Sequence, residues 1–240
     1  MRTSASALLA SSGVNERSAI EPHRRDERRR LALWFGLIGF FIVVQYAGHS
    51  AGKSESDPLY KWSFAAGSVI QEAIFLLIVL AIAGFSIERL GLRLPKLKWR
   101  AVGLLVGGFF VIQSFEFVYV AIAHPGNEQG LTPDKWQPSH AAAYVVNGLI
   151  VCTLVPFVEE LTFRGLGFHL LRPHGKWVAI FGTGVLFGLS HGLLLALPIL
   201  IVFGCVLAWI REQTNSAVPG MLLHGTFNLV ALVAAVTVHR

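Results

Sequence analysis

The chain has 240 residues, of which 54% are hydrophobic and 14% charged, and its mean hydropathy is +0.59. A soluble domain carries about 25% charged residues, so the composition excludes an ordinary soluble protein. It predicts an all-α polytopic membrane helical bundle, because lipid leaves the backbone no hydrogen-bonding partner but itself. Cys152 and Cys205 both lie in apolar runs, which argues against a disulfide framework.

The first 30 residues are polar and end in the charged run 24–30. We expect residues 1–30 to form a disordered cytoplasmic tail whose arginines anchor the first span at the lipid headgroups. Nucleic-acid binding is not expected, although the net charge is +6, because the basic residues gather at the ends of apolar spans. Residues 31–240 are predicted to form the transmembrane domain.

About seven transmembrane helices are predicted, each near the roughly 20 residues that a bilayer requires. We place them at 31–48, 62–85, 101–123, 141–171, 177–193, 197–211 and 217–238. The segments on the tail side of these spans hold 16 Lys and Arg residues, against 4 on the other side. The positive-inside rule therefore predicts a cytoplasmic N-terminus.

The fourth predicted span contains the most unusual stretch of the chain. Residues 141–157 carry no charge, and Glu159, Glu160 and Arg164 follow. Charges inside a membrane are costly, so they indicate function by default. The i,i+4 spacing lets Arg164 neutralise Glu160, while Glu159 points away from that face and remains free to act.

Other polar residues also lie within the predicted spans. They are Gln71, Glu72, Gln113, Glu116, Asn147, His191, His224 and Asn228. Gln71, Gln113 and Asn147 are interpreted as hydrogen-bonding partners of neighbouring helices. At ~1.5 Å per residue, the histidines reach the same depth as the glutamate pair, in the cytoplasmic half of the membrane. A shared depth favours one site over several independent accidents.

These residue types suit the activation of a water molecule. A buried glutamate can act as general base, an imidazole can share the water, and His224 with Asn228 can donate to the oxyanion of a tetrahedral intermediate. The chain lacks membrane aspartates and HExxH, which argues against two other protease types. A serine mechanism with Ser190 and His224, and a zinc site of Glu159, His191 and His224, remain alternatives.

The motifs Glu159-Glu160…Arg164, Phe187…His191 and His224…Asn228 resemble those of the CPBP family in order and spacing. This family includes the type II CAAX prenyl endopeptidases and the bacteriocin-processing and immunity proteins. The motif-bearing core covers about 140–235. The segment Gly91-Leu92-Arg93 also resembles many bacterial members.

The resemblance implies a helical membrane fold with a catalytic cavity open to the cytoplasm, in the bacterial inner membrane. It implies catalytic roles for Glu159, His191, His224 and Asn228. Glu160 and Arg164 would support the first motif, and Phe187 would line the wall beside His191. No cofactor is expected, although the family has also been described as metal-dependent, which would make zinc the ion.

We therefore expect an intramembrane endopeptidase that cuts a membrane-associated peptide or protein near the cytoplasmic face. Its expected partners are membrane lipids and that substrate, with no nucleic acid. One alternative is a non-catalytic membrane immunity or scaffold protein, which keeps the polar cluster for helix assembly. A more distant one is a transporter that relays protons through Glu72, Glu116 and Glu159.

Overall fold

A computed structural model describes the backbone of residues 3–51, 57–96, 98–124, 128, 133 and 136–237, and the side chains of these residues from Arg24 onward except 49–51. All regular structure in these residues is helical. The longer helices are α1 (Thr3–Ala51), α2 (Trp62–Ala83), α3 (Lys98–Ala123), α7 (Lys176–Leu189), α8 (Leu197–Thr214) and α9 (Val218–Thr237).

One further long helix changes its winding along its length. Its parts are α4 (Ala141–Leu149), the π-helical η3 (Ile150–Leu154), α5 (Val155–Glu160), the π-helical η4 (Leu161–Gly167) and α6 (Phe168–Leu171). Three short 3₁₀ turns complete the described elements: η1 (Pro58–Tyr60), η2 (Pro138–His140) and η5 (Arg172–His174). The predicted end of this span at residue 171 is confirmed, because α6 ends at Leu171.

Six helical segments in the described residues are long and apolar enough to cross a membrane. The fifth predicted span is shorter than expected, because α7 has 14 residues and ends at Leu189. Its chain then turns at Gly192, whose φ of +68° favours glycine. The all-α polytopic bundle is confirmed, with six full-length spans and one short apolar helix.

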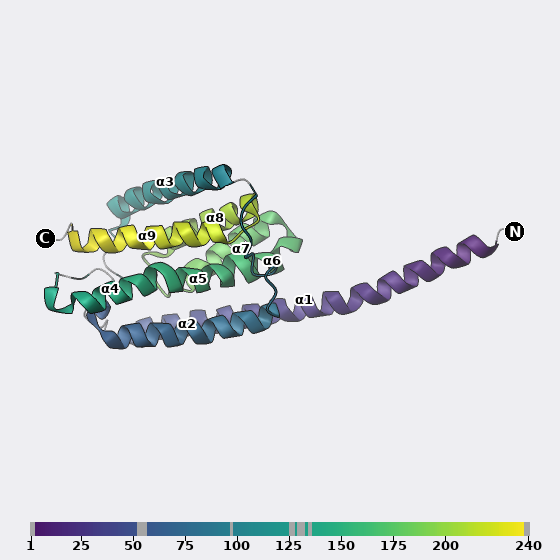
Figure 1. The fold of residues 1–240 in the computed structure, drawn as a ribbon, viewed down its shortest axis with the longest axis horizontal. Coiled ribbons are helices and arrows are strands. Elements are labelled where there is room, and N and C mark those ends of the chain that lie inside the picture. Colours follow the sequence, from purple (N-terminus) through teal and green to yellow (C-terminus); the bar gives the residue numbers. More distant parts are fainter. Residues whose placement is uncertain are drawn as a thin grey trace.

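Helix α1 begins at Thr3, so the backbone is helical where the sequence predicts a disordered tail. The segment contains many Arg and Ala residues, which favour helix, and it also contains five serines, which favour it less. It extends away from the bundle (Figure 1). The side chains before Arg24 lie outside the described residues, and a tail that ends at residue 30 stays a prediction.

Two side chains of the charged run 24–30 form hydrogen bonds to the bundle. Glu27 accepts two hydrogen bonds from Arg89, at 3.1 and 2.8 Å, and Arg30 donates to the carbonyl of Ile82. We call this end of the bundle, formed by residues 84–96, 172–175 and 211–217, the tail end.

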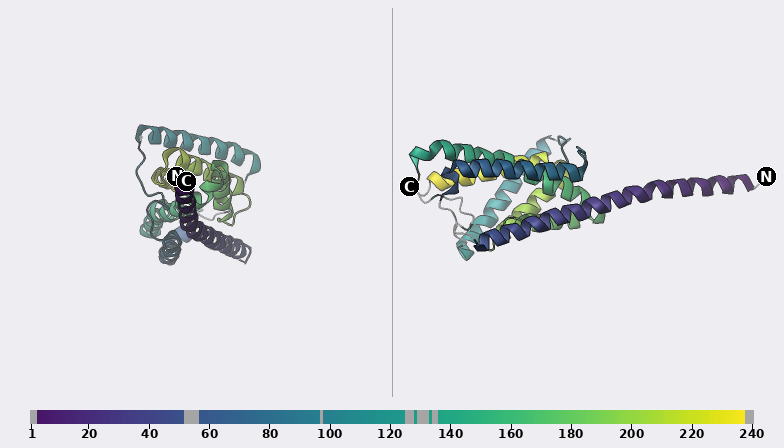
Figure 2. Two further views of the ribbon diagram at one scale, coloured as in Figure 1. Left: turned by 90° about the vertical axis from the view of Figure 1, so that its right-hand side faces the viewer. Right: turned by 90° about the horizontal axis from the view of Figure 1, so that it is seen from below.

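The long helix from α4 to α6 lies in the middle of the bundle (Figure 1). Helices α1 and α2 pack on one side of it, and α3 packs against α8 and α9 on the other. The left view of Figure 2 shows the same separation of α3 from α1 and α2. Helices α7 and α8 approach closely, because a Cβ at Gly204 would lie 2.7 Å from the carbonyl oxygen of Gly184.

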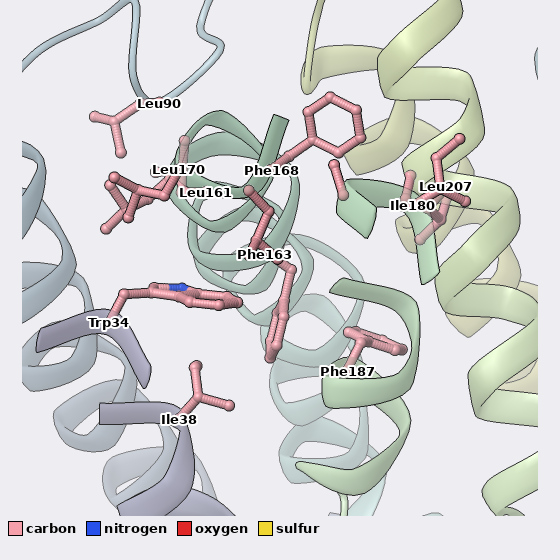
Figure 3. Close-up of a cluster of buried hydrophobic side chains, with 14 of the residues drawn as sticks. Trp34, Ile38, Leu90, Leu161, Phe163, Phe168, Leu170, Ile180, Phe187 and Leu207 are labelled. Atoms are coloured by element: carbon pink, nitrogen blue, oxygen red, sulfur yellow. The ribbon is translucent and has the colours of Figure 1, made fainter. Parts of the chain in front are cut away.

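The main hydrophobic core surrounds η4 and α6. The indole of Trp34 lies against this helix from α1, and Phe187 approaches it from α7 (Figure 3). Both rings are almost fully buried. A Cβ at Gly167 would overlap the Trp34 ring, so the glycine allows the indole to lie flush against the helix backbone.

Candidate active site

Proline at position 156 explains the unusual winding before the glutamate pair. Proline has no backbone N–H and cannot donate to the carbonyls one turn earlier in the helix. In the π-helical geometry of η3, the carbonyl five residues before Pro156 belongs to Val151. The side-chain Nδ2 of Asn228 donates to that carbonyl at 2.8 Å. Pro156 and Asn228 thereby connect the glutamate-bearing helix to α9.

The expected pairing of Arg164 with Glu160 is confirmed. Nη1 of Arg164 lies 2.9 Å from Oε1 of Glu160, and both side chains are fully buried. Nη2 of Arg164 also donates to the carbonyl of Gly204 at 3.0 Å, and its guanidinium lies 4.4 Å from the centre of the Phe187 ring. The arginine thus neutralises one carboxylate and joins α7 and α8 to the central helix.

His224 lies between the two glutamates. Its Nδ1 is 3.4 Å from Oε1 of Glu160, and its Nε2 is 3.6 Å from Oε2 of Glu159. Glu159 therefore has an imidazole neighbour from another helix, and its catalytic role stays a prediction. Gly220 explains the approach of α9, because a Cβ there would overlap the Glu160 carboxylate. The Glu159 side chain is nevertheless 21% exposed, whereas that of Glu160 is 0% exposed.

His191 lies just beyond the end of α7. Its Nδ1 is 2.8 Å from the carbonyl oxygen of Phe187. A carbonyl only accepts hydrogen bonds, so Nδ1 carries the hydrogen and Nε2 of a neutral ring is left to accept. Among the described side chains, His191 makes no ion pair with either glutamate.

Phe187 forms the wall that the sequence predicts beside His191. The ring centres of Phe187 and His191 are 4.7 Å apart, and those of Phe187 and His224 are 5.7 Å apart. Phe187 therefore touches both imidazoles as well as the Arg164 guanidinium. It fixes their relative positions with an apolar surface.

Two of the alternatives gain no support from this arrangement. Ser190 donates its hydroxyl to the carbonyl of Phe187 at 2.7 Å, and His224 faces the carboxylates rather than this serine. In the part of the chain that is described, no group of three or more His, Cys, Asp or Glu side chains is placed to hold a metal ion. The zinc set of Glu159, His191 and His224 is thus not assembled in this conformation.

Sequence reasoning missed two residues that hold the site from outside the motifs. The indole Nε1 of Trp34 donates to the carbonyl of Thr162 at 3.0 Å, and Nε of Arg211 donates to the carbonyl of Arg164 at 2.8 Å. Both acceptors lie in η4, where the i→i+5 pattern alters the backbone hydrogen bonding. Neither residue belongs to a motif. Both reach their acceptors only through the packing of the helices, which the sequence does not show.

Of the two other membrane glutamates, the structure brings one to the site. Glu72 on α2 is buried, interacts electrostatically with Glu159 and accepts a hydrogen bond from Gln71 at 3.4 Å. Glu116 on α3 is half-buried, and no hydrogen bond or ion pair joins it to a described motif residue. Asn147, interpreted as a helix-to-helix partner, donates to the carbonyls of Leu59 and Lys61.

Residues 141–230 match the protein family described as type II CAAX prenyl endopeptidase Rce1-like. The match includes the whole polar layer from Glu159 to Asn228 and leaves the first three long helices outside. No curated protein and no solved structure matches the chain. The family resemblance seen in the motifs is confirmed. Residues 141–230 of this integral membrane chain are thus similar to the Rce1-like type II CAAX prenyl endopeptidases, a family of intramembrane proteases.

Proposed function

We propose that the protein is a glutamate-dependent intramembrane endopeptidase. It hydrolyses a peptide bond of a membrane-associated peptide or protein, and it works from the tail end of the bundle, which the charge distribution predicts to be cytoplasmic. The observation that carries the proposal is the contrast between the two glutamates. Glu160 is neutralised by Arg164, whereas Glu159 lies partly exposed beside an imidazole.

In this mechanism Glu159 is the general base. Its Oε2 is buried and has no hydrogen-bond partner among the described residues, which suits an atom that receives a proton from water. The water oxygen attacks the peptide carbonyl carbon as the proton passes to Glu159. His191 accepts a hydrogen bond from the same water through Nε2, the nitrogen left unprotonated by the Phe187 contact.

The tetrahedral intermediate places a negative charge on the former carbonyl oxygen. Nε2 of His224 lies 3.6 Å from Oε2 of Glu159, beyond hydrogen-bond distance, and can donate to that oxygen when it carries its hydrogen. Asn228 uses one amide hydrogen on Val151 and has a second for the oxyanion. When the intermediate collapses, the C–N bond breaks and Glu159 returns its proton to the leaving amine.

The decisive experiment compares the purified wild type with Glu159→Gln on a library of membrane-proximal peptides. Glutamine keeps the shape but cannot accept the proton, so cleavage should fall by about 10²–10⁴-fold. Glu116→Gln is the matched control, since it makes the same change in a spanning helix away from the site, and it should cleave like the wild type. Undiminished cleavage by folded Glu159→Gln would falsify the proposal.

The same assay distinguishes the alternatives. A zinc-dependent form of the reaction predicts that chelation abolishes cleavage and that added zinc restores it. A serine mechanism predicts that Ser190→Ala is inactive, whereas we expect it to remain active. A non-catalytic immunity or scaffold protein predicts no cleavage by any variant and a loss of stability or partner binding in Glu159→Gln.

The proposed location is the bacterial inner membrane with a cytoplasmic N-terminus. The basic residues at the tail end support this orientation. Labelling of single cysteines introduced at residues 29 and 140 in intact cells tests it. Residue 140, at the opposite end of the bundle, should react with an impermeant reagent, and residue 29 should not.

A further inference from the structure

A cavity of about 560 Å³ opens at the tail end, away from the glutamate pair. Its walls come from the loop after α2, the η5 turn and the C-terminal end of α8. The lining is mainly charged, with three arginines and two glutamates. Phe168 and Pro173 supply an apolar part. No step of the proposed hydrolysis uses this cavity.

Two of the five charged side chains in the lining form an ion pair with each other. Arg172 donates to Glu212 through Nε at 2.7 Å and through Nη2 at 2.9 Å, a two-pronged pair. The charges left to receive a ligand are therefore those of Arg93, Arg211 and Glu88.

Arg211 is held rigidly at the cavity. It is buried, its Nη1 donates to Oδ1 of Asn215 at 2.9 Å, and its guanidinium lies 5.3 Å from the centre of the Phe168 ring. Gly91 makes room for it, since a Cβ there would lie 3.0 Å from Nε of Arg211, and φ at this glycine is +63°. A fixed guanidinium loses little entropy when it binds an anion.

Arg93 faces the same cavity and is exposed. It makes no ion pair with any described residue, and it repels Arg211 electrostatically. Its backbone is fixed, because Ser216 donates its hydroxyl to the Arg93 carbonyl and Ala217 donates to the carbonyl of Gly91. Arg93 on this braced loop and Arg211 on α8 are neighbouring cations, and they favour an anion between them.

We propose that this cavity binds the phosphoethanolamine headgroup of a membrane phospholipid, with the phosphate between Arg93 and Arg211 and the ammonium at Glu88. Glu88 is exposed in the same lining and would repel a purely anionic ligand, so the three charges match a phosphate that carries an ammonium group. The cavity lies where the spanning helices end, at the depth of lipid headgroups. Basic pockets at this depth are known to bind the phosphates of lipid headgroups such as that of cardiolipin.

The headgroup site would be connected to the candidate active site through one residue. Nε of Arg211 donates to the backbone carbonyl of Arg164, whose guanidinium binds Glu160. A bound headgroup would therefore hold Arg211, and with it the η4 backbone. The consequence for cleavage rests on the proposed function, whereas binding itself does not.

Native mass spectrometry of the full chain, with phosphatidylethanolamine, phosphatidylglycerol or phosphatidylcholine added, measures binding directly. We expect retention of one phosphatidylethanolamine, about tenfold weaker binding in Arg93→Gln through loss of a charge-assisted hydrogen bond, and loss of the preference over phosphatidylglycerol in Glu88→Gln. Arg29→Gln is the matched control, since it removes an exposed arginine from α1 outside the cavity, and it should bind like the wild type.

Equal binding by wild type and Arg93→Gln, or equal retention of the three lipids by the wild type, would overturn the site. Soluble glycerophosphoethanolamine carries the same headgroup without the lipid chains. If it saturates the site while phosphatidylethanolamine does not bind, the ligand is a soluble molecule and the proposed membrane lipid is wrong. A cleavage assay in vesicles with and without phosphatidylethanolamine then tests the coupling, and unchanged cleavage despite confirmed binding would refute the coupling alone.

Discussion

Two arginine–glutamate pairs of this protein share one chemistry and differ in their surroundings. Arg164 and Glu160 are 2.9 Å apart in the middle of the bundle, and neither side chain is exposed. Arg172 and Glu212 are 2.7 Å apart at the tail end, where the arginine side chain is 48% exposed. Burial removes the water that would otherwise solvate a broken pair. The geometry of a pair therefore says less about its importance than its depth does.

The largest effect is expected from Arg164→Met. This change leaves the Glu160 carboxylate buried without its cation, which should reduce stability by about 3–5 kcal/mol and abolish cleavage. Thermal unfolding in detergent measures the first effect and peptide cleavage the second. A variant that unfolds like the wild type would show that the buried pair does not control the fold.

Gly220→Ala should have the next largest effect. The new Cβ would overlap the Glu160 carboxylate, so α9 must move or the carboxylate must rotate. Overpacking of this kind costs about 1–3 kcal/mol, and we expect a lower kcat because His224 moves with α9. Gly148→Ala is the matched control: its Cβ would make an ordinary contact of 3.6 Å with Leu232. Equal activity and stability of the two variants would contradict the close approach of α9.

Trp34→Phe tests the support that α1 gives to the buried pair. Phenylalanine keeps an aromatic ring but cannot donate to the Thr162 carbonyl, so stability should fall by about 1 kcal/mol. We also expect a lower kcat with KM unchanged, because η4 carries Arg164. Trp99→Phe makes the same change at a residue that is 88% exposed, and it should leave both quantities unaltered. If the two variants behave alike, the indole hydrogen bond is irrelevant to the site.

The smallest effect is expected from Arg172→Met. Exposed pairs contribute little, because water replaces the lost partner. Thermal unfolding and peptide cleavage should both match the wild type within error. A destabilisation comparable to that of Arg164→Met would show that depth does not distinguish the two pairs.

Much of the site could be predicted from local spacing. Arg164 follows Glu160 by four residues, and this spacing places both on one helix face even where the winding becomes π-helical. The placement of Phe187 beside His191 follows from the same rule. The contact between Glu159 and His224 could not be predicted in this way, because His224 comes from another helix. Helix spacing contains no information about the rotation of α9 against α5.

Hydropathy alone determined the membrane class and the positions of six spans, because these depend on composition. Only the tertiary structure decided that α7 ends at Leu189, since hydropathy does not detect a turn in an apolar segment. It also decided which side chains bind the carbonyls of Val151, Thr162 and Arg164. These contacts join residues distant in sequence, and helix packing sets them rather than any local pattern.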